Sequence, residues 1–392
     1  MPTERHYMRL ALRLAQRGCG MTSPNPMVGA VLVRGGRIIG RGWHHRAGEP
    51  HAEIEALLDA QKRGHTAKGA TLYVTLEPCC TQGRTPPCTE AIIAAGIKRV
   101  VAGAMDPNPR HHGKGFRILR RSGVEVAQEV MAAQCERLNE AFNHWIVQRT
   151  PFVTVKAAMT LDGKIATAAG ESKWITGEKA RAWGMKLRQG MDAILVGINT
   201  VLADDPSLTF RGKAAGVRGH GLRRIVLDAR ARTPLGARVV SDEHSSLTTI
   251  VVSKLAPRSR VAALETRVQV LVVPFAKGGP RARGGSSPGR EHLALDLGWL
   301  LKQLGSENVT SLLVEGGGEV SASFLLEGLA QRIVFFYAPK VLGGRDSRRA
   351  VAGEGARGLN QVLNLSEVEW RRLGPDLLLS ARMDTRLRTG PA

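Results

Sequence analysis

Apolar positions in the first part of the chain alternate between helical and strand-like spacing. Residues 5–17 and 51–64 carry apolar side chains three or four positions apart, which predicts amphipathic helices. Between them, AVLVRGGRIIGRG predicts two strands that turn at Gly35 and Gly36. Further expected elements are strands at 70–78 and 98–107, a helix at 87–97, and helical character over 117–146. This order predicts an open, mainly parallel sheet covered by helices.

The pattern restarts at Arg149-Thr150-Pro151 and predicts a second α/β domain of about 240 residues. Its strand candidates are the apolar runs at 151–160, 192–197, 223–229, 248–253, 268–275, 309–317 and 332–341. Helical patterns occur around 178–189, 298–304 and 320–327. We therefore expect domains at 1–148 and 149–392, with a flexible surface insertion at 276–292 that is rich in Gly, Pro, Arg and Ser.

Size and cysteine content narrow the class of protein. A chain of 392 residues is long enough for two hydrophobic cores. The first helix is interrupted by arginines, unlike an export signal, and no apolar run reaches the roughly 18 residues of a membrane span. Five cysteines, three of them clustered, do not suit a disulfide framework. We expect a cytoplasmic protein whose clustered thiols bind metal or take part in catalysis.

The formal net charge of +22 raises the question of nucleic-acid binding. The basic residues are dispersed, however, and few aromatic side chains are interleaved with them to stack on bases. We therefore expect no specific nucleic-acid partner. The charge would also attract a phosphorylated substrate or cofactor.

A metal-ligand pattern links the thiol-rich stretch LEPCCTQGRTPPC to an upstream PHAE. His51, Cys79 and Cys88 are donors that suit zinc, and three protein ligands leave one position for water. Glu53 can then handle the proton of that water. The pattern matches the H-x-E and P-C-x-x-C signature of zinc nucleobase deaminases, except that the second thiol follows nine positions after the first. His51 and Cys88 both stand at predicted helix starts, where a thiolate is stabilised.

Two other interpretations of these residues stay open. A structural zinc site in a non-enzymatic binding protein would need a fourth ligand such as Cys80; otherwise Cys80 and Cys135 are expected to be structural. A nucleic-acid base deaminase would be a single domain of about 150 residues with a basic groove. That second alternative leaves the second predicted domain unexplained.

The second domain contains a glycine run but no ordinary dinucleotide motif. No G-x-G-x-x-G follows a strand. Instead, Glu315-Gly316-Gly317-Gly318 follows a predicted strand and precedes a helix near Val320. Glycines at a helix N-terminus let a phosphate approach free backbone N–H groups, so this segment predicts a phosphate cradle.

Two sets of motifs identify a family resemblance. PNPMVGAV, GWHHRAGEPHAE, TLEPCCTQGRTPPC and DPNPRHHGKG, followed by PFVTVKAAMTLDGKIA, ESKWITG, DAILVGINTVLADDPSLTFR and EGGGEVSASFL, closely resemble the bifunctional riboflavin-biosynthesis deaminase/reductase. The resemblance runs from about Arg5 to Leu379. It implies a cytidine-deaminase-like α/β/α domain followed by a dihydrofolate-reductase-like α/β domain. It also implies a zinc ion, NADPH, a phosphorylated pyrimidine substrate and a homo-oligomer, either a dimer or a larger assembly.

The implied chemistry has two steps. The first domain would remove the 2-amino group of 2,5-diamino-6-ribosylamino-4(3H)-pyrimidinone 5′-phosphate as ammonia. The second would reduce the ribosyl group with NADPH to give 5-amino-6-(5-phosphoribitylamino)uracil. For the first step the resemblance assigns zinc to His51, Cys79 and Cys88 and proton transfer to Glu53. It assigns substrate contacts to Asn25, His44 and, at the phosphate, Arg84. The family often has Ser-His where this chain has Cys80-Thr81, which removes one expected contact.

The resemblance also assigns residues of the second site. The NADPH site would be lined by Ala158, Trp174, Thr200, Asp204, Gly317, Gly318, Glu319, Val320, Ser321, Ala322 and Ser323. The substrate would contact Ser172, Arg188, Leu208, Arg211 and Glu315, with the arginines suited to its phosphate. Lys156 and Asp162 are expected to flank this site, and Thr160 stands where the family usually has serine. Trp174 would instead be a core residue, and Asp204-Asp205-Pro206 a turn, if these segments are only structural.

Overall fold

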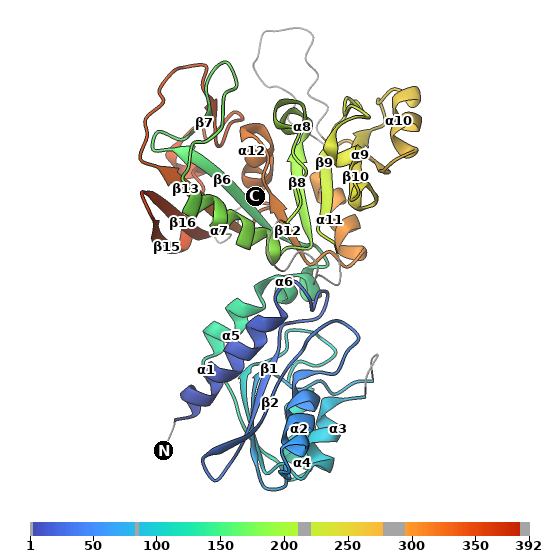
Figure 1. The fold of residues 1–392 in the computed structure, drawn as a ribbon, viewed down its shortest axis with the longest axis vertical. Coiled ribbons are helices and arrows are strands. Elements are labelled where there is room, and N and C mark those ends of the chain that lie inside the picture. Colours follow the sequence, from blue (N-terminus) through green and yellow to red (C-terminus); the bar gives the residue numbers. More distant parts are fainter. Residues whose placement is uncertain (1–2, 83–85, 211–220, 277–294, 385–392) are drawn as a thin grey trace. The chain divides into compact units, whose positions relative to one another are not determined.

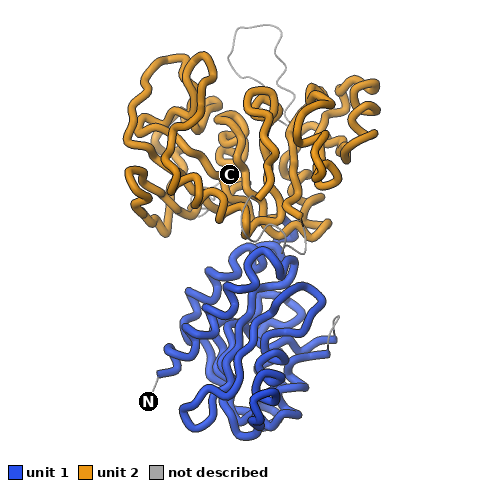
Figure 2. The backbone as a smooth tube through the Cα atoms, viewed as in Figure 1, with its two compact units in different colours: residues 1–150, 218–220 blue, residues 151–217, 221–392 orange. Residues whose placement is uncertain are grey.

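The computed structural model describes residues 3–82, 86–210, 221–276 and 295–384. Two compact units divide the chain between Thr150 and Pro151 (Figure 2). Arg84, Arg211 and residues 277–292 of the expected insertion lie outside the described residues.

A five-stranded sheet in the order β2-β1-β3-β4-β5 forms the centre of the first unit (Figure 1). Gly35 and Gly36 form the expected β1–β2 turn with positive φ angles of 57° and 75°, which favour glycine. β3, β4 and β5 run parallel, as predicted. The expectation of helical character throughout 117–146 is wrong at β5, whose three residues are too few to show a strand period. The strands are β1 Gly29–Arg34, β2 Arg37–Trp43, β3 Thr71–Leu76, β4 Arg99–Ala104 and β5 Glu125–Ala127.

Helices cover both faces of this sheet. α1 and α5 lie on one face and α2, α3 and α4 on the other (Figure 1). Contact between α2 and β2 is close, because a Cβ atom at Gly42 would lie 2.3 Å from the Ala52 carbonyl oxygen. Glycine at this position therefore fixes the start of α2 against the sheet. The helices are α1 Glu4–Ala15, α2 Ala52–Lys62, α3 Cys88–Ala94, α4 Lys114–Arg121, α5 Ala132–Leu138 and α6 Glu140–Gln148.

The second unit contains a nine-stranded sheet in the order β11-β10-β9-β8-β12-β6-β13-β16-β15. The strands from β11 to β13 are parallel and are the seven that the sequence predicts. The interior strands β8 and β12 have continuous apolar runs because both of their faces are buried, whereas the edge strand β11 is partly exposed. The strands are β6 Phe152–Thr160, β8 Ala193–Gly197, β9 Arg223–Leu227, β10 Thr248–Ser253, β11 Gln269–Val273, β12 Ser311–Val314 and β13 Arg332–Ala338.

Antiparallel strands complete this unit and are absent from the sequence expectation. β16 Asp376–Met383 pairs with β13, and β15 Leu365–Leu373 pairs with β16 at the sheet edge. β7 Lys164–Ala166 and β14 Arg348–Arg349 form a separate two-stranded sheet. The described helices are α7 Glu178–Gln189, α8 Ile198–Asp204, α9 Arg238–Ser241, α10 Arg258–Glu265, α11 Leu297–Ser306 and α12 Gly318–Leu326. The sequence pattern predicts α7, α11 and α12 but misses the shorter α8, α9 and α10.

Candidate functional site

The structure brings the three expected zinc ligands together in the first unit. His51 directly precedes α2, Cys79 follows β3, and Cys88 is the first residue of α3. Their ligand atoms all lie within 4.8 Å of one another. His51 Nδ1 is 3.3 Å from Cys88 Sγ and 3.5 Å from Cys79 Sγ. The end of one strand and the starts of two helices thus converge on one point.

The chemistry of this cluster fits a catalytic zinc ion. One imidazole nitrogen and two sulfur atoms are ligands that zinc prefers, and a tetrahedral ion would keep a fourth position. Hydrogen bonding with the Cys88 side chain lowers the pKa of the Cys79 thiol to about 4, and the Cys88 backbone N–H, which donates to Cys79 Sγ at 3.3 Å, adds to this effect. The thiolate is the form that binds metal.

Cys80 does not join the cluster. Its Sγ lies 3.5 Å from Nδ1 of His111, on the side of the DPNPRHHGKG segment. Among the residues described, the metal-ligand group has three members. The alternative of a closed structural site with Cys80 as fourth ligand therefore has no support in this geometry.

Glu53 lies in the first turn of α2, close to the cluster, and is only 4% exposed. Burial raises the pKa of its carboxyl group to about 7, against the opposing effect of nearby His51. A carboxyl group with a pKa near neutrality can both take up and release a proton at working pH.

Asn25 and His44 lie beside the same cluster. His44 is buried, and its Nδ1 donates to the Pro50 carbonyl oxygen at 3.1 Å. Because a carbonyl only accepts, this bond places the ring proton on Nδ1 and leaves Nε2 facing the Asn25 amide at 3.1 Å. Burial lowers the pKa of His44, which favours the neutral ring. The His44 and His51 rings meet edge to face at 5.3 Å.

Glu77 is a supporting residue to which the sequence reasoning assigns no role. Its buried carboxylate accepts hydrogen bonds from the backbone N–H groups of Asp106, Gly113 and Gly115, at 3.2, 2.8 and 2.9 Å. It therefore fastens the DPNPRHHGKG segment to the loop that carries Cys79. The sequence feature that could have indicated this supporting role is a carboxylate at the end of a buried strand, directly before Pro78.

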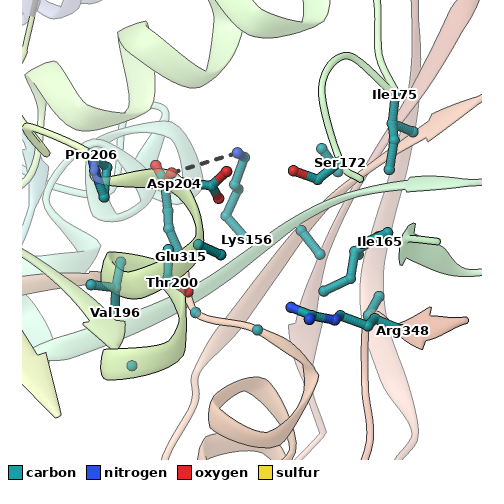
Figure 3. Close-up of a pocket in the computed structure, with 18 of the residues that line it drawn as sticks. Lys156, Ile165, Ser172, Ile175, Val196, Thr200, Asp204, Pro206, Glu315 and Arg348 are labelled. Atoms are coloured by element: carbon teal, nitrogen blue, oxygen red, sulfur yellow. Dashed lines mark ion pairs between the residues drawn. The ribbon is translucent and has the colours of Figure 1, made fainter. Parts of the chain in front are cut away.

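The second unit contains a cavity of about 1690 Å³ (Figure 3). Trp174 on its wall is 66% exposed, so the alternative of a core tryptophan is wrong. Ser321, Ala322 and Ser323 do not line the cavity, and the first two are buried within α12. The expected site residues that do line it are Ala158, Ser172, Trp174, Arg188, Thr200, Asp204, Leu208, Glu315, Gly317, Gly318, Glu319 and Val320.

An ion-pair network forms part of the cavity wall. Glu315, directly after β12, accepts hydrogen bonds from Arg188 Nε and Nη2 at 3.0 and 2.9 Å. The Lys156 ammonium lies 3.6 Å from the same carboxylate. A dashed line marks this ion pair in Figure 3. Burial would raise the pKa of Glu315, but Lys156 and Arg188 together lower it to about 2. Arg188 is thus already paired with a carboxylate of the protein.

The space available for a side chain differs among the three glycines at 316–318. A Cβ atom at Gly316 would lie 2.6 Å from Val320, and one at Gly318 would lie 2.2 Å from the Arg349 carbonyl oxygen. At Gly317 it would meet nothing within 4 Å. Packing therefore demands two of these glycines, whereas the backbone at Gly317 faces open space at the N-terminus of α12.

Asp162 does not line the cavity but binds the backbone of a neighbouring segment. Its carboxylate accepts from the Leu342 and Gly343 backbone N–H groups at 3.0 and 2.8 Å. The Thr160 hydroxyl donates to it at 2.6 Å, so the threonine keeps the function of a serine hydroxyl here.

Comparison with known proteins covers both units. Residues 1–104 match the cytidine and deoxycytidylate deaminase zinc-binding region, and residues 151–379 match the RibD C-terminal domain. The riboflavin biosynthesis protein RibD of Aquifex aeolicus is 43% identical over 96% of this chain and 97% of its own length. The Escherichia coli protein of the same name is 39% identical over 96% and 98%. The chain belongs to the RibD family.

Solved RibD structures agree with this assignment. Acinetobacter baumannii RibD is 34% identical, with a TM-score of 0.82, over 97% of this chain and 99% of that one. A diaminohydroxyphosphoribosylaminopyrimidine deaminase/5-amino-6-(5-phosphoribosylamino)uracil reductase from Thermotoga maritima has the same identity and coverage and a TM-score of 0.77.

Family membership confirms the expected class of enzyme. A RibD protein combines a zinc-binding deaminase domain with a reductase domain and functions in riboflavin biosynthesis. The alternatives of a single-domain nucleic-acid base deaminase and of a non-enzymatic binding protein are therefore excluded. No helix among the described residues is long and apolar enough to cross a membrane.

Proposed function

We propose that the chain catalyses both consecutive steps implied by its RibD relatives. The first is hydrolytic deamination of 2,5-diamino-6-ribosylamino-4(3H)-pyrimidinone 5′-phosphate. The second is NADPH-dependent reduction of the ribosyl group to give 5-amino-6-(5-phosphoribitylamino)uracil. The observation that carries the proposal is the convergence of His51, Cys79 and Cys88 beside the buried carboxyl of Glu53.

In the deamination step, His51, Cys79 and Cys88 would hold a zinc ion. A zinc ion there supplies a bound water whose pKa lies near 7. Beside such an ion, Glu53 would accept a proton from the attacking water as the water oxygen forms a bond to C2 of the pyrimidine. It then returns the proton to the 2-amino nitrogen as the carbon–nitrogen bond breaks and ammonia leaves. Its raised pKa suits both transfers.

Asn25 and His44 would orient the pyrimidine. The hydrogen bond from His44 Nδ1 to Pro50 fixes one ring orientation. That orientation presents Nε2 to Asn25 and so holds the Asn25 amide in one orientation. A substrate that contacts this amide would therefore meet donor and acceptor atoms that are already oriented. The bound ring would lie next to the zinc ligands because His44 packs edge to face on His51.

In the reduction step, the cavity of the second unit would hold NADPH beside the ribosylamino group. NADPH bound there would supply the hydride for C1′ of the sugar. As the bond from C1′ to the ring oxygen breaks, that oxygen would need a proton. Lys156, which lines the cavity, would stabilise the developing negative charge on that oxygen or supply its proton. Its ion pair with Glu315 orients the ammonium group.

Location and assembly are the remaining parts of the proposal. We place the protein in the cytoplasm because the zinc ligands require reduced thiols. We also propose a homo-oligomer, a dimer or larger, in which a second copy covers the exposed apolar side chains of the edge strand β15.

Purified zinc-loaded protein, supplied with the diaminopyrimidinone ribosyl phosphate and NADPH, tests the two activities. Ammonia release and NADPH oxidation are followed together, and the product is identified by mass spectrometry. Glu53→Gln should abolish ammonia release while still oxidising NADPH when the deaminated intermediate is supplied. Glu55→Gln, in the same helix and near His45, is the matched control. Absence of ammonia release from wild-type protein that holds one zinc per chain would refute the deaminase proposal.

A further inference from the structure

The cavity of the second unit is lined by seven described cationic side chains, which fall into two groups. One group is already engaged with protein atoms through ion pairs or hydrogen bonds: Lys156, Lys173, Arg181, Arg188 and Arg238. The other group is Arg348 and Arg349 of β14. Within the described part of the chain, neither of these two side chains has an ion pair or a hydrogen bond.

The backbone around Arg348 is held in place from two sides. In one direction β14 pairs with β7, with Arg348 opposite Ala166, and the Ala350 N–H donates to the Gly163 carbonyl at 3.0 Å. In the other direction the Ala352 N–H donates to the Gly318 carbonyl at 3.1 Å. The segment 348–352 therefore spans from the β7 strand to the N-terminus of α12. This anchoring gives the arginine a defined position.

The Arg348 side chain is directed into the cavity. Figure 3 shows its guanidinium end projecting from β14 on the side where Ile165 and Ser172 lie. Gly170 lies beside the guanidinium, since a Cβ atom added at Gly170 would lie 3.1 Å from Arg348 Nη2. A glycine at that position leaves room for the guanidinium and offers it no competing acceptor side chain.

From this arrangement we propose that Arg348 binds a phosphate group of the dinucleotide cofactor. The inference rests on the proposed NADPH-dependent reduction. A guanidinium presents a planar fork of donors that matches phosphate oxygens. The same segment is bonded to Gly318, where α12 begins and the backbone at Gly317 is open. A phosphate at that helix N-terminus would meet free N–H groups on one side and the arginine on the other.

The position of Arg348 favours the cofactor over the phosphate of the sugar substrate. Segment 348–352 is attached to the glycine run, where the sequence predicts a cofactor phosphate cradle. The residues expected to contact the substrate include Arg188 and Glu315, which belong to α7 and to the end of β12 and already form their own ion pair. Both ligands carry phosphate, however, so the experiment must separate them.

Equilibrium binding of NADPH and of NADH to the full-length, zinc-loaded protein tests the proposal. Wild-type protein is measured first, because failure to bind NADPH would refute the reductase assignment itself. Arg348→Gln should then raise the Kd for NADPH about tenfold or more, as expected for loss of a charge-assisted hydrogen bond. Arg348→Lys should restore part of the affinity, and the salt dependence of binding should become weaker in the Gln variant. An equal loss of affinity for NADH would assign the contact to the diphosphate. A loss of affinity confined to NADPH would assign it to the 2′-phosphate. Either result supports the proposal.

Arg345→Gln is the matched control, because Arg345 is an exposed arginine three positions away that does not line the cavity. Its Kd for NADPH should stay within twofold of wild type. Circular dichroism and thermal melting verify that each variant folds. An unchanged Kd for NADPH in folded Arg348→Gln would overturn the proposal. So would a rise confined to the KM of the ribosylamino substrate, which would assign the arginine to the substrate phosphate.

Discussion

Arg188 and Glu315 form a two-pronged ion pair that joins α7 to the end of β12, with nitrogen–oxygen distances of 3.0 and 2.9 Å. The two side chains are only 15% and 10% exposed, and the Lys156 ammonium lies on the same carboxylate. Two cations therefore depend on a single anion inside the cavity wall.

Replacing Glu315 with glutamine should accordingly destabilise the second unit. The variant leaves Arg188 and Lys156 without their countercharge, which costs about 3 kcal/mol for a largely buried pair. Urea unfolding at pH 7, followed by tryptophan fluorescence and far-UV circular dichroism, measures the difference. Glu319→Gln, which removes a carboxylate from the same wall, should change the free energy of unfolding by under about 0.5 kcal/mol. Equal effects of the two variants would contradict the prediction.

The pH dependence of that difference has a definite sign. The folded pKa of Glu315 is about 2, below its ordinary value of 4.5. A lowered pKa means that the contribution to stability is fully present above about pH 4.5 and is lost as the pH falls towards 2. The stability difference between wild type and Glu315→Gln should therefore shrink between pH 4.5 and pH 3. A difference that stays constant over this range would show that the carboxylate charge is not what stabilises the fold.

Zinc content should distinguish the thiols of the CCTQGRTPPC stretch. Cys88→Ala removes one of three ligands and should reduce bound zinc well below one ion per chain. Cys80→Ala should retain one ion, because the Cys80 sulfur faces His111 instead of the cluster. Elemental analysis of the dialysed proteins measures both. Loss of zinc from Cys80→Ala would revive the four-ligand structural site.

The elements and ligands that the sequence predicts are those with a strong periodic or chemical signal. The parallel strands inside the sheet are buried on both faces and appear as apolar runs. His51, Cys79 and Cys88 are a donor set that suits zinc and lie in the order of a known signature, although the two thiols are further apart than in that signature. β15 has no buried face along most of its length, so its residues give no such signal. Glu77 binds backbone N–H groups of Asp106, Gly113 and Gly115, and the segment that carries Arg348 is bonded to Gly163 and Gly318. Contacts of that kind depend on the fold and cannot be read from local spacing.

Asn25→Ala should weaken substrate binding in the deamination step. The variant removes the amide that meets His44 Nε2 at 3.1 Å, while the hydrogen bond from His44 to Pro50 remains. Loss of one neutral hydrogen bond predicts a KM for the diaminopyrimidinone up to about tenfold higher. Steady-state ammonia release measures it, and the KM of the reduction step in the same protein is the internal control. A rise in both KM values would indicate a general loss of structure instead.

The edge strand β15 should carry the contact between copies of the chain. Along it, Val368 and Trp370 are 48% and 59% exposed, and Leu377 of the adjoining β16 is 42% exposed. An edge strand with several exposed apolar side chains favours pairing with another chain. Trp370→Glu should therefore shift the protein towards monomer in light scattering coupled to size-exclusion chromatography. Trp299→Glu is the matched control, since Trp299 is 37% exposed on α11, away from this strand. An unchanged molar mass for Trp370→Glu, with wild type oligomeric, would place the contact on another surface.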